Sequence, residues 1–204
     1  AEVARAVGDR RVEVACHDHN RGVGAAIATG YARAAAAAGG GRDAFVVMAG
    51  DGQMDPRDLP SLVDPIAAGR ADYVKGNRFA SPALSRAMPI ARRVAGLAFS
   101  RLTSLAIGAR ISDSQCGYTA ISREACARID LGSLWPGYGY PNDLLSQLAV
   151  RGLRIAEVPV LGVYADEVSR LKPRHVPVVA ALVARAWTRR MRAMVLARSR
   201  GLSS

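Results

Sequence analysis

The sequence predicts an α/β fold with a mostly parallel sheet flanked by helices. Three observations support this class. Apolar, strand-like runs alternate with helical patterns along the chain, which is the order that builds a parallel sheet. Residues 45–48 (Phe-Val-Val-Met) form an uninterrupted apolar run just before Asp51, as expected of a strand that is buried on both faces. Half of the 204 residues are hydrophobic, which is enough for a sizeable core.

The N-terminal half contains two further strand candidates, two helix candidates and the end of a further helix besides this run. Residues 1–7 are typical of the end of a helix, and residues 12–16 predict a strand. Residues 25–38 are rich in alanine and predict a helix. A buried strand at 44–49 is followed by a helix at 56–68, because Asp55 can cap that helix and Pro56 suits its first turn. Residues 71–75 predict a short strand.

The C-terminal half alternates in the same way. Its predicted elements, in order, are a long helix within 86–107 that starts at Pro89, a loop within 111–120 that can end in a short strand, a helix at 122–129, a loop at 134–140, a helix at 143–151, a strand at 155–163 and a helix at 176–198.

Charge is distributed unevenly along the chain. The net charge is +11, and residues 170–204 contain nine Lys or Arg and no Asp or Glu. Such a tail predicts an anionic partner, either a membrane surface or nucleic acid. Arg185, Arg189 and Arg192 recur at helical spacing beside apolar residues, which suits a helix that lies on an anionic membrane. Docking of this helix onto the protein's own sheet, or onto a missing transmembrane segment, is the alternative.

Cysteine content and hydropathy bear on the compartment. The three cysteines form no closely spaced pair, which favours reduced thiols and a cytoplasmic protein. No apolar run reaches the roughly 20 residues that a membrane-spanning helix needs. We therefore expect a protein that binds peripherally at the inner face of the membrane.

The acidic turn after the buried strand is the strongest candidate site. Asp51 lies where the strand ends, and open α/β sheets bind ligands at the carboxyl ends of their strands. The carboxylate of Asp51 and the amide oxygen of Gln53 can share a divalent cation bound to a diphosphate. An ordinary Asp-Gly turn is the alternative.

Two other segments are candidates for anion binding. Asn20 and Gly22 precede a helix, and backbone amides at a helix N-terminus favour phosphate, although taken alone this segment fits a structural turn better. Lys75 and Arg78 follow a short strand and could hold a leaving diphosphate or an anionic acceptor. A solvated basic loop is the alternative for this pair.

Two loops carry candidate reacting groups. The segment from Asp113 to Gln115 brings together an acid and an amide, and the acid can either take part in the reaction or accept hydrogen bonds from backbone amides. Asp143 precedes or begins a helix, so it can serve as a general base or as a plain helix cap.

The order of these motifs resembles that of family 2 glycosyltransferases. The branch that contains dolichol-phosphate mannose synthases and bacterial polyprenol-phosphate or cell-wall glycosyltransferases is the most similar, over residues 10–175. The matching segments are Asn20-x-Gly-x-Gly, Gly50-Asp51-Gly52-Gln53 with Asp55-Pro56, and the segments 72–78, 113–118 and 157–159.

The resemblance implies a GT-A fold, a nucleotide-sugar donor, a divalent metal (Mg or Mn) and inversion at the anomeric carbon. The implied acceptor is a polyprenol phosphate or a saccharide, and no nucleic acid is expected as a partner. By the same resemblance Asp51 and Gln53 bind the metal, and Asp143 and Asp113 are catalytic. The remaining implied site residues bind donor or acceptor: Asn20, Gly22, Gly50, Lys75, Arg78, Gln115, Ser169 and Lys172.

The sequence departs from the family pattern in three respects, one of which is that the tail lacks the transmembrane pair found in some relatives. Ala49 stands where many members have Asp, and the family's opening strand is missing. We therefore expect an N-terminally incomplete GT-A domain at residues 1–169 and a basic amphipathic tail at residues 170–204. Two other functions stay open: a nucleotidyltransferase of similar α/β fold, and a non-catalytic basic module that binds membrane or nucleic acid.

Overall fold

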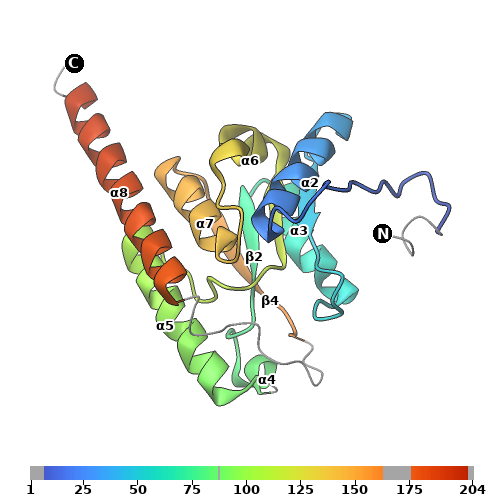
Figure 1. Ribbon diagram of the computed structural model, residues 1–204, viewed down its shortest axis with the longest axis horizontal. Coiled ribbons are helices and arrows are strands. Elements are labelled where there is room, and N and C mark those ends of the chain that lie inside the picture. The colour runs from blue at the N-terminus through green and yellow to red at the C-terminus, as the bar shows by residue number, and fades with distance from the viewer. Residues whose placement is uncertain (1–6, 87, 163–175, 202–204) are drawn as a thin grey trace.

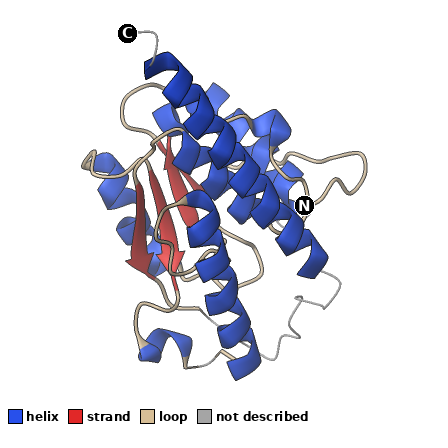
Figure 2. Ribbon diagram, turned by 90° about the vertical axis from the view of Figure 1, so that its left-hand side faces the viewer, coloured by secondary structure: helices blue, strands red, loops and turns tan. Residues whose placement is uncertain are grey.

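A four-stranded sheet lies at the centre of the computed structural model, which describes residues 7–86, 88–162 and 176–201. Figures 1 and 2 show helices packed around this sheet. The strands are β1 (Ala44–Val47), β2 (Tyr73–Asn77), β3 (Thr119–Ser122) and β4 (Ile155–Pro159). The helices are α2 (Val23–Ala37), α3 (Leu59–Ala67), α4 (Pro82–Ser85), α5 (Ile90–Ile107), α6 (Arg123–Arg128), α7 (Tyr140–Val150) and α8 (Val176–Gly201), with short 3-10 helices η1 (Pro56–Asp58) and η2 (Leu131–Ser133).

The strands are arranged in the order β1-β3-β2-β4. β2 and β4 pair in parallel, whereas β3 runs antiparallel to both β1 and β2. Three of the four described strands therefore point the same way, as predicted, but β3 makes the sheet mixed. The reversal has a simple cause: Thr119, the first residue of β3, lies opposite Val47 and Lys75. The loop after α5 thus returns to the edge where β1 and β2 end, and β3 enters the sheet from that edge.

Neighbouring residues of a strand point to opposite sides of the sheet, so each strand contributes side chains to both faces. Helices pack against both faces and bury these side chains. Tyr73 and Ile121 belong to the core beneath α5, α6 and α7, whereas Val74 and Ala120 pack with Leu62 of α3 on the other face. Both cores are apolar, as the predicted sheet with helices on either side requires.

The predicted strand at residues 12–16 is wrong. In the structure this segment is a loop whose side chains are mostly exposed, and Val12 is 42% exposed. The alternation of residue types is suitable for a strand, but a strand is stable only when its backbone pairs with a neighbour. No described strand lies beside this segment.

Helix α8 packs across α5 and α7 and then continues beyond the body of the molecule (Figure 1). Its first half buries Leu182 and Ala186 against the core, which matches the predicted helix at 176–198. The predicted domain boundary near residues 169 and 170 lies outside the described residues and stays a prediction. In the parts of the chain that the structure describes, no helix is long and apolar enough to cross a bilayer.

Candidate active site

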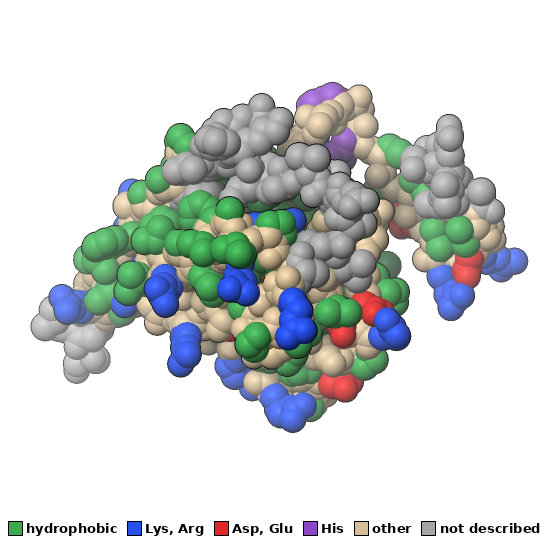
Figure 3. Space-filling model, turned by 90° about the horizontal axis from the view of Figure 1, so that it is seen from below, with side chains coloured by type: hydrophobic (Ala, Val, Ile, Leu, Met, Phe, Trp, Pro, Cys, Tyr) green, Lys and Arg blue, Asp and Glu red, His purple; other side chains and the backbone are tan. Residues whose placement is uncertain are grey.

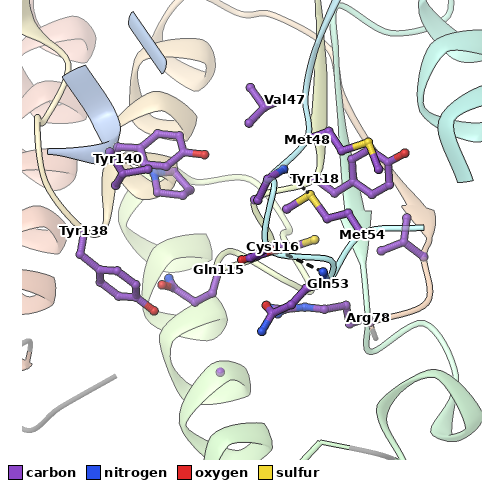
Figure 4. A pocket seen from close by; sticks show the side chains of 18 of the residues that line it. Val47, Met48, Gln53, Met54, Arg78, Gln115, Cys116, Tyr118, Tyr138 and Tyr140 are labelled. Carbon is purple, nitrogen blue, oxygen red and sulfur yellow. Dashed lines mark hydrogen bonds between the residues drawn. The ribbon is translucent and has the colours of Figure 1, made fainter. Parts of the chain in front are cut away.

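A pocket of about 390 Å³ lies at the edge of the sheet where β1, β2 and β4 end. Its lining includes Met48 and Ala49 after β1, Arg78 and Phe79 after β2, and Val160 after β4. Because these three strands point the same way, their carboxyl ends meet at one edge, which is where open α/β sheets bind ligands. Figure 4 shows how side chains from these segments surround a common space.

The turn after β1 places Asp51 and Gln53 on the pocket. Oδ1 of Asp51 accepts a hydrogen bond from the backbone N of Gln53 at 3.1 Å. Gly52 between them has a φ of 76°, a left-handed conformation that glycine adopts without strain. The side chain of Asp51 is exposed. Asp55 accepts a hydrogen bond from the backbone N of Arg57 at 2.9 Å and caps η1, which confirms its predicted capping role.

Arg78 lines the pocket and is held from behind by Asp113. Nε of Arg78 donates to Oδ2 of Asp113 at 2.7 Å, and Nη2 donates to Oδ1 at 3.0 Å. Asp113 is fully buried and is not among the described residues that line the pocket. Burial by itself would raise the pKa of Asp113, but the hydrogen bonds and charges of Arg78 and Lys75 outweigh it and lower the pKa. These contacts favour a role in positioning Arg78 over the predicted catalytic role.

The loop that carries Asp113 is fixed to β4. Oε1 of Glu157 accepts hydrogen bonds from the backbone N of Ser112 and of Asp113, each at 2.9 Å. Oδ1 of Asp113 in turn accepts from the backbone N of Gln115 at 3.2 Å and of Cys116 at 3.0 Å. The side chain of Gln115 therefore starts from a well-ordered turn and reaches the pocket, as predicted for a binding residue.

Lys75 does not lie in the predicted basic loop. β2 continues to Asn77, two residues beyond the predicted end, so Lys75 is inside the sheet and fully buried. Its Nζ donates to the backbone carbonyl of Cys116, and burial lowers its pKa. Lys75 is not among the described pocket-lining residues, which speaks against the predicted contact with a diphosphate.

The N-terminus of α2 is likewise occupied by the protein itself. Oδ1 of Asn20 accepts from the backbone N of Gly22 at 2.9 Å. The backbone N atoms of Gly24 and Ala25 both donate to the carbonyl of Pro136, at 2.7 and 3.3 Å. The amides of Gly22, Gly24 and Ala25 at this helix end therefore already have partners, which favours the structural-turn alternative for Asn20 and Gly22.

Asp143 lies beneath α8 rather than in the pocket. Its side chain is 1% exposed, and Oδ1 is 3.1 Å from Nε of Arg185 and 3.0 Å from Nη1 of Arg189. Oδ2 accepts from the backbone N of Trp135 at 3.0 Å. Helix α7 begins at Tyr140, three residues earlier than predicted, which turns Asp143 toward α8. This geometry speaks against the predicted role of Asp143 as a general base.

The same ion pairs change the prediction for the basic tail. Arg185 and Arg189 face Asp143, and their side chains are 39% and 21% exposed. Of the three arginines predicted to contact a membrane, Arg192 alone is exposed in the described part of α8.

Three other predicted site residues complete the comparison. Gly50 lies in the turn just before Asp51 but is not among the described pocket-lining residues. Ser169 and Lys172 lie outside the described residues, so their predicted roles stay predictions.

Several pocket residues had no role in the sequence analysis. Tyr138 and Tyr140 reach the pocket from the loop before α7 and from its first turn, and Arg92 reaches it from α5. Burial raises the pKa of Tyr138, while the charges of Arg92 and Arg78 act to lower it. The Tyr-Gly-Tyr run was a usable signal for the loop. No sequence signal marked Arg92 as a pocket residue, because the face that α5 presents to the pocket depends on tertiary packing.

The donor atoms in the pocket suit a divalent cation that shares its coordination with a substrate. Asp51 offers a carboxylate and Gln53 an amide oxygen, and Mg²⁺ is commonly held by one or two carboxylates together with substrate phosphates. Within the described ranges, no group of three or more His, Cys, Asp or Glu side chains converges on one point.

A ligand pocket at the carboxyl ends of the strands, with an acidic turn beside a fixed arginine, is typical of α/β proteins that bind phosphorylated ligands. The family is more specific. The model of "Glycosyl transferase family 2" matches residues 1–130, and the chain belongs to this family. The resemblance inferred from the motifs is thereby confirmed.

Curated relatives of the chain include enzymes named for lipid-phosphate acceptors. The UDP-N-acetylglucosamine–dolichyl-phosphate N-acetylglucosaminyltransferase of Methanococcus voltae is 31% identical over 150 residues, covering 74% of this chain and 59% of the relative. The undecaprenyl-phosphate mannosyltransferase of Micrococcus luteus is 31% identical over 121 residues, covering 59% and 49%. The chain thus spans about half to three fifths of the length of these relatives.

The GT-A-type fold is confirmed by similarity to a solved structure. Glucosyl-3-phosphoglycerate synthase from Mycobacterium tuberculosis, crystallised with uridine diphosphate, has a TM-score of 0.53 and 28% sequence identity to this chain. The match covers 88% of this chain and 57% of the synthase.

Proposed function

We propose that the chain forms the catalytic core of an inverting glycosyltransferase that moves a sugar from a nucleoside-diphosphate sugar to a lipid phosphate. One observation carries the proposal: Asp51 and Arg78 line the same pocket at the carboxyl ends of the strands, in a member of glycosyl transferase family 2. The relatives named for dolichyl-phosphate and undecaprenyl-phosphate acceptors support the lipid-phosphate class.

Asp51 and Gln53 would hold a Mg²⁺ or Mn²⁺ ion against the diphosphate of the donor. When bound, this ion offsets the negative charge that develops on the leaving nucleoside diphosphate. Arg78 adds a fixed positive charge in the same pocket, and Asp113 keeps its guanidinium group oriented. Charges that are already in place when the reaction begins stabilise a transition state more than mobile ones do.

The nature of the acceptor follows from the position of the carboxylates. A sugar hydroxyl must lose a proton as it attacks, which requires a general base, whereas a phosphate is already ionised. Among the described residues that line the pocket, Asp51 is the sole carboxylate, and we assign it to the cation. Asp143 is buried beneath α8. These positions favour a lipid phosphate, with a saccharide acceptor as the alternative.

One side of the pocket suits an anionic head group that carries an apolar chain. Arg78 and Arg92 both line the pocket, and guanidinium groups bind phosphate well. Phe79, Met88 and Phe99 line the pocket as well. We assign this side to the acceptor.

The outer surface of α5 and α8 suits peripheral binding at the inner face of a membrane. On α5, Ile90 and Leu105 are each 74% exposed, and on α8, Trp187 is 59% exposed. Figure 3 shows a band of hydrophobic side chains over α5 with arginine side chains along its border. Apolar residues bordered by basic ones are typical of helices that lie in the headgroup region of anionic membranes.

The proposal is tested by titration calorimetry of UDP, GDP and UDP-N-acetylglucosamine, with and without Mn²⁺. We expect at least one nucleotide to bind in a Mn²⁺-dependent way, and Asp51→Asn to weaken that binding by about 100-fold. Asp64→Asn is the matched control, because Asp64 is an exposed carboxylate of α3 outside the pocket lining. Equal affinities for the two variants, or no Mn²⁺-dependent binding of any nucleotide, would overturn the proposal.

Family membership speaks against the nucleotidyltransferase alternative. The non-catalytic binding module would require the pocket to bind no donor, and the same titration addresses it.

A further inference from the structure

A buried polar network lies behind the pocket and ends at Gln115. Helix α5 contributes Ser100 and Thr103, the loop before β3 contributes Ser114, and α7 contributes Asn142. These four residues are each at most 2% exposed. Most buried polar groups in proteins are hydrogen-bonded, and the hydrogen bonds of this network constrain the side chains that belong to it.

The amide of Gln115 has a defined orientation in this network. Its Nε2 donates to Oγ of Ser114 at 3.0 Å and to Oδ1 of Asn142 at 3.2 Å. An amide nitrogen carries two hydrogens, so both are used by the protein. Gln115 also lines the pocket, and Figure 4 shows its side chain extending on the side of Tyr138. The group left for a ligand is therefore the carbonyl oxygen Oε1.

Both acceptors of the Gln115 amide are themselves held by α5. Oδ1 of Asn142 also accepts from Oγ1 of Thr103 at 3.3 Å. The backbone N of Ser114 donates to Oγ of Ser100 at 2.9 Å. Asn142 therefore lies between a helix and the pocket residue, and it contacts Gln115 without lining the pocket. Its Nδ2 is buried and has no hydrogen-bond partner among the described residues, so Asn142 acts in this network as an acceptor.

We propose that Asn142 is a positioning residue that turns the amide of Gln115 so that Oε1 faces the pocket. In this orientation Gln115 accepts a hydrogen bond from a hydroxyl or N–H group of the transferred sugar and so determines donor specificity. The part that concerns the sugar rests on the proposed function, whereas the orientation of the amide does not. A site built to hydrogen-bond one substrate group discriminates strongly against analogues that lack it.

The orientation is tested by amide hydrogen exchange in solution NMR. The chain contains three glutamines, Gln53, Gln115 and Gln147, so labelling with ¹⁵N-glutamine gives three side-chain signals, and Gln115→Glu assigns one of them. Gln147 is a buried reference, because its Nε2 donates to the carbonyl of Asp130 at 3.0 Å. We expect the Gln115 side-chain hydrogens to exchange at least about tenfold more slowly than those of free glutamine.

Two variants at position 142 sharpen this test. Asn142→Ala removes the acceptor, so exchange at Gln115 should accelerate about tenfold while Gln147 stays protected. Asn142→Asp keeps an acceptor oxygen and removes the unpaired donor, so it should restore slow exchange. Fast exchange at Gln115 in the native chain would mean that the NH₂ group faces the pocket, and it would overturn the proposal even if no variant folded. Unchanged exchange in Asn142→Ala would overturn the role of Asn142.

The role in specificity is tested with UDP-glucose, UDP-N-acetylglucosamine and their deoxy analogues, with UDP as the reference. We expect one analogue to bind the native chain about tenfold more weakly than its parent. Gln115→Ala and Asn142→Ala should both abolish this difference, Asn142→Ala should leave UDP affinity unchanged, and the double variant should show no further loss of discrimination. Persistence of the discrimination in Gln115→Ala, or its absence in the native chain, would overturn this role. Failure of UDP itself to bind would instead count against the proposed function, because the exchange result does not depend on a donor.

Discussion

Asp143→Asn decides between a structural carboxylate and a general base. The substitution keeps the shape of the side chain but removes the charge that faces Arg185 and Arg189. Breaking a buried ion pair by removing one partner costs about 3–5 kcal/mol. The two arginine side chains are 39% and 21% exposed, so water compensates part of this, and we expect a loss of about 2 kcal/mol. In a domain of this size, that loss lowers Tm by about 4–8 °C.

The assay combines thermal unfolding with sugar transfer measured well below Tm. If Asp143 is structural, the variant should show the lower Tm. Its kcat/KM should stay within about tenfold of the native value, because the protein remains folded at the assay temperature. Asp64→Asn, an exposed carboxylate on α3, should change neither quantity. A fall in kcat of about 1,000-fold or more at an unchanged Tm would refute the reasoning, since only loss of a reacting group explains that combination. It would also favour a sugar hydroxyl as the acceptor.

Three further predictions concern stability and surface binding. The lowered pKa of Asp113 stabilises the fold above the ordinary carboxyl pKa, and this contribution is lost as the pH falls through the folded-state value. Urea unfolding between pH 6 and about pH 3 should therefore show the native advantage over Asp113→Asn shrinking on acidification, and a constant difference would contradict this. In Gly24→Ala, the new Cβ would lie 2.0 Å from the carbonyl oxygen of Trp135, so we expect about 2 kcal/mol of destabilisation; Gly30→Ala is the control, because nothing lies within 4 Å of its Cβ position, and equal effects would contradict the steric argument. Trp187→Ser should weaken binding to phosphatidylserine vesicles about tenfold in a sedimentation assay, and unchanged binding would exclude Trp187 from the membrane contact.

Local signals in the sequence predicted the acidic turn well. The apolar run before Asp51, the capping residue Asp55 and the adjacent Pro56 act over a few residues, and each favours a strand, a turn and a helix start without help from the rest of the chain. The structure places them as predicted, with η1 and α3 directly after the turn. Arg78 and Gln115 also line the pocket as predicted.

The errors arose where the outcome depends on distant parts of the chain. Residues 12–16 have the composition of a strand, but a strand needs a neighbour that the local sequence does not supply. The helical spacing correctly predicted that Arg185 and Arg189 share one face of a helix. It does not predict whether that face is exposed to solvent or packs against Asp143. The position of Asp143 beneath α8 was not predicted for the same reason, because the two arginines that face it are more than 40 positions away in the sequence.

The carboxylate of Glu157 has a consequence for how the pocket meets its ligand. It ties the 112–113 turn to β4, and that turn holds the guanidinium group of Arg78 in a forked contact. The conformational entropy of the Arg78 side chain is therefore lost when the protein folds. Little further entropy is lost when an anion binds. A lysine at position 78 would keep the charge but could not make the same two-point contact, so this corner of the pocket would have to become ordered each time an anion binds.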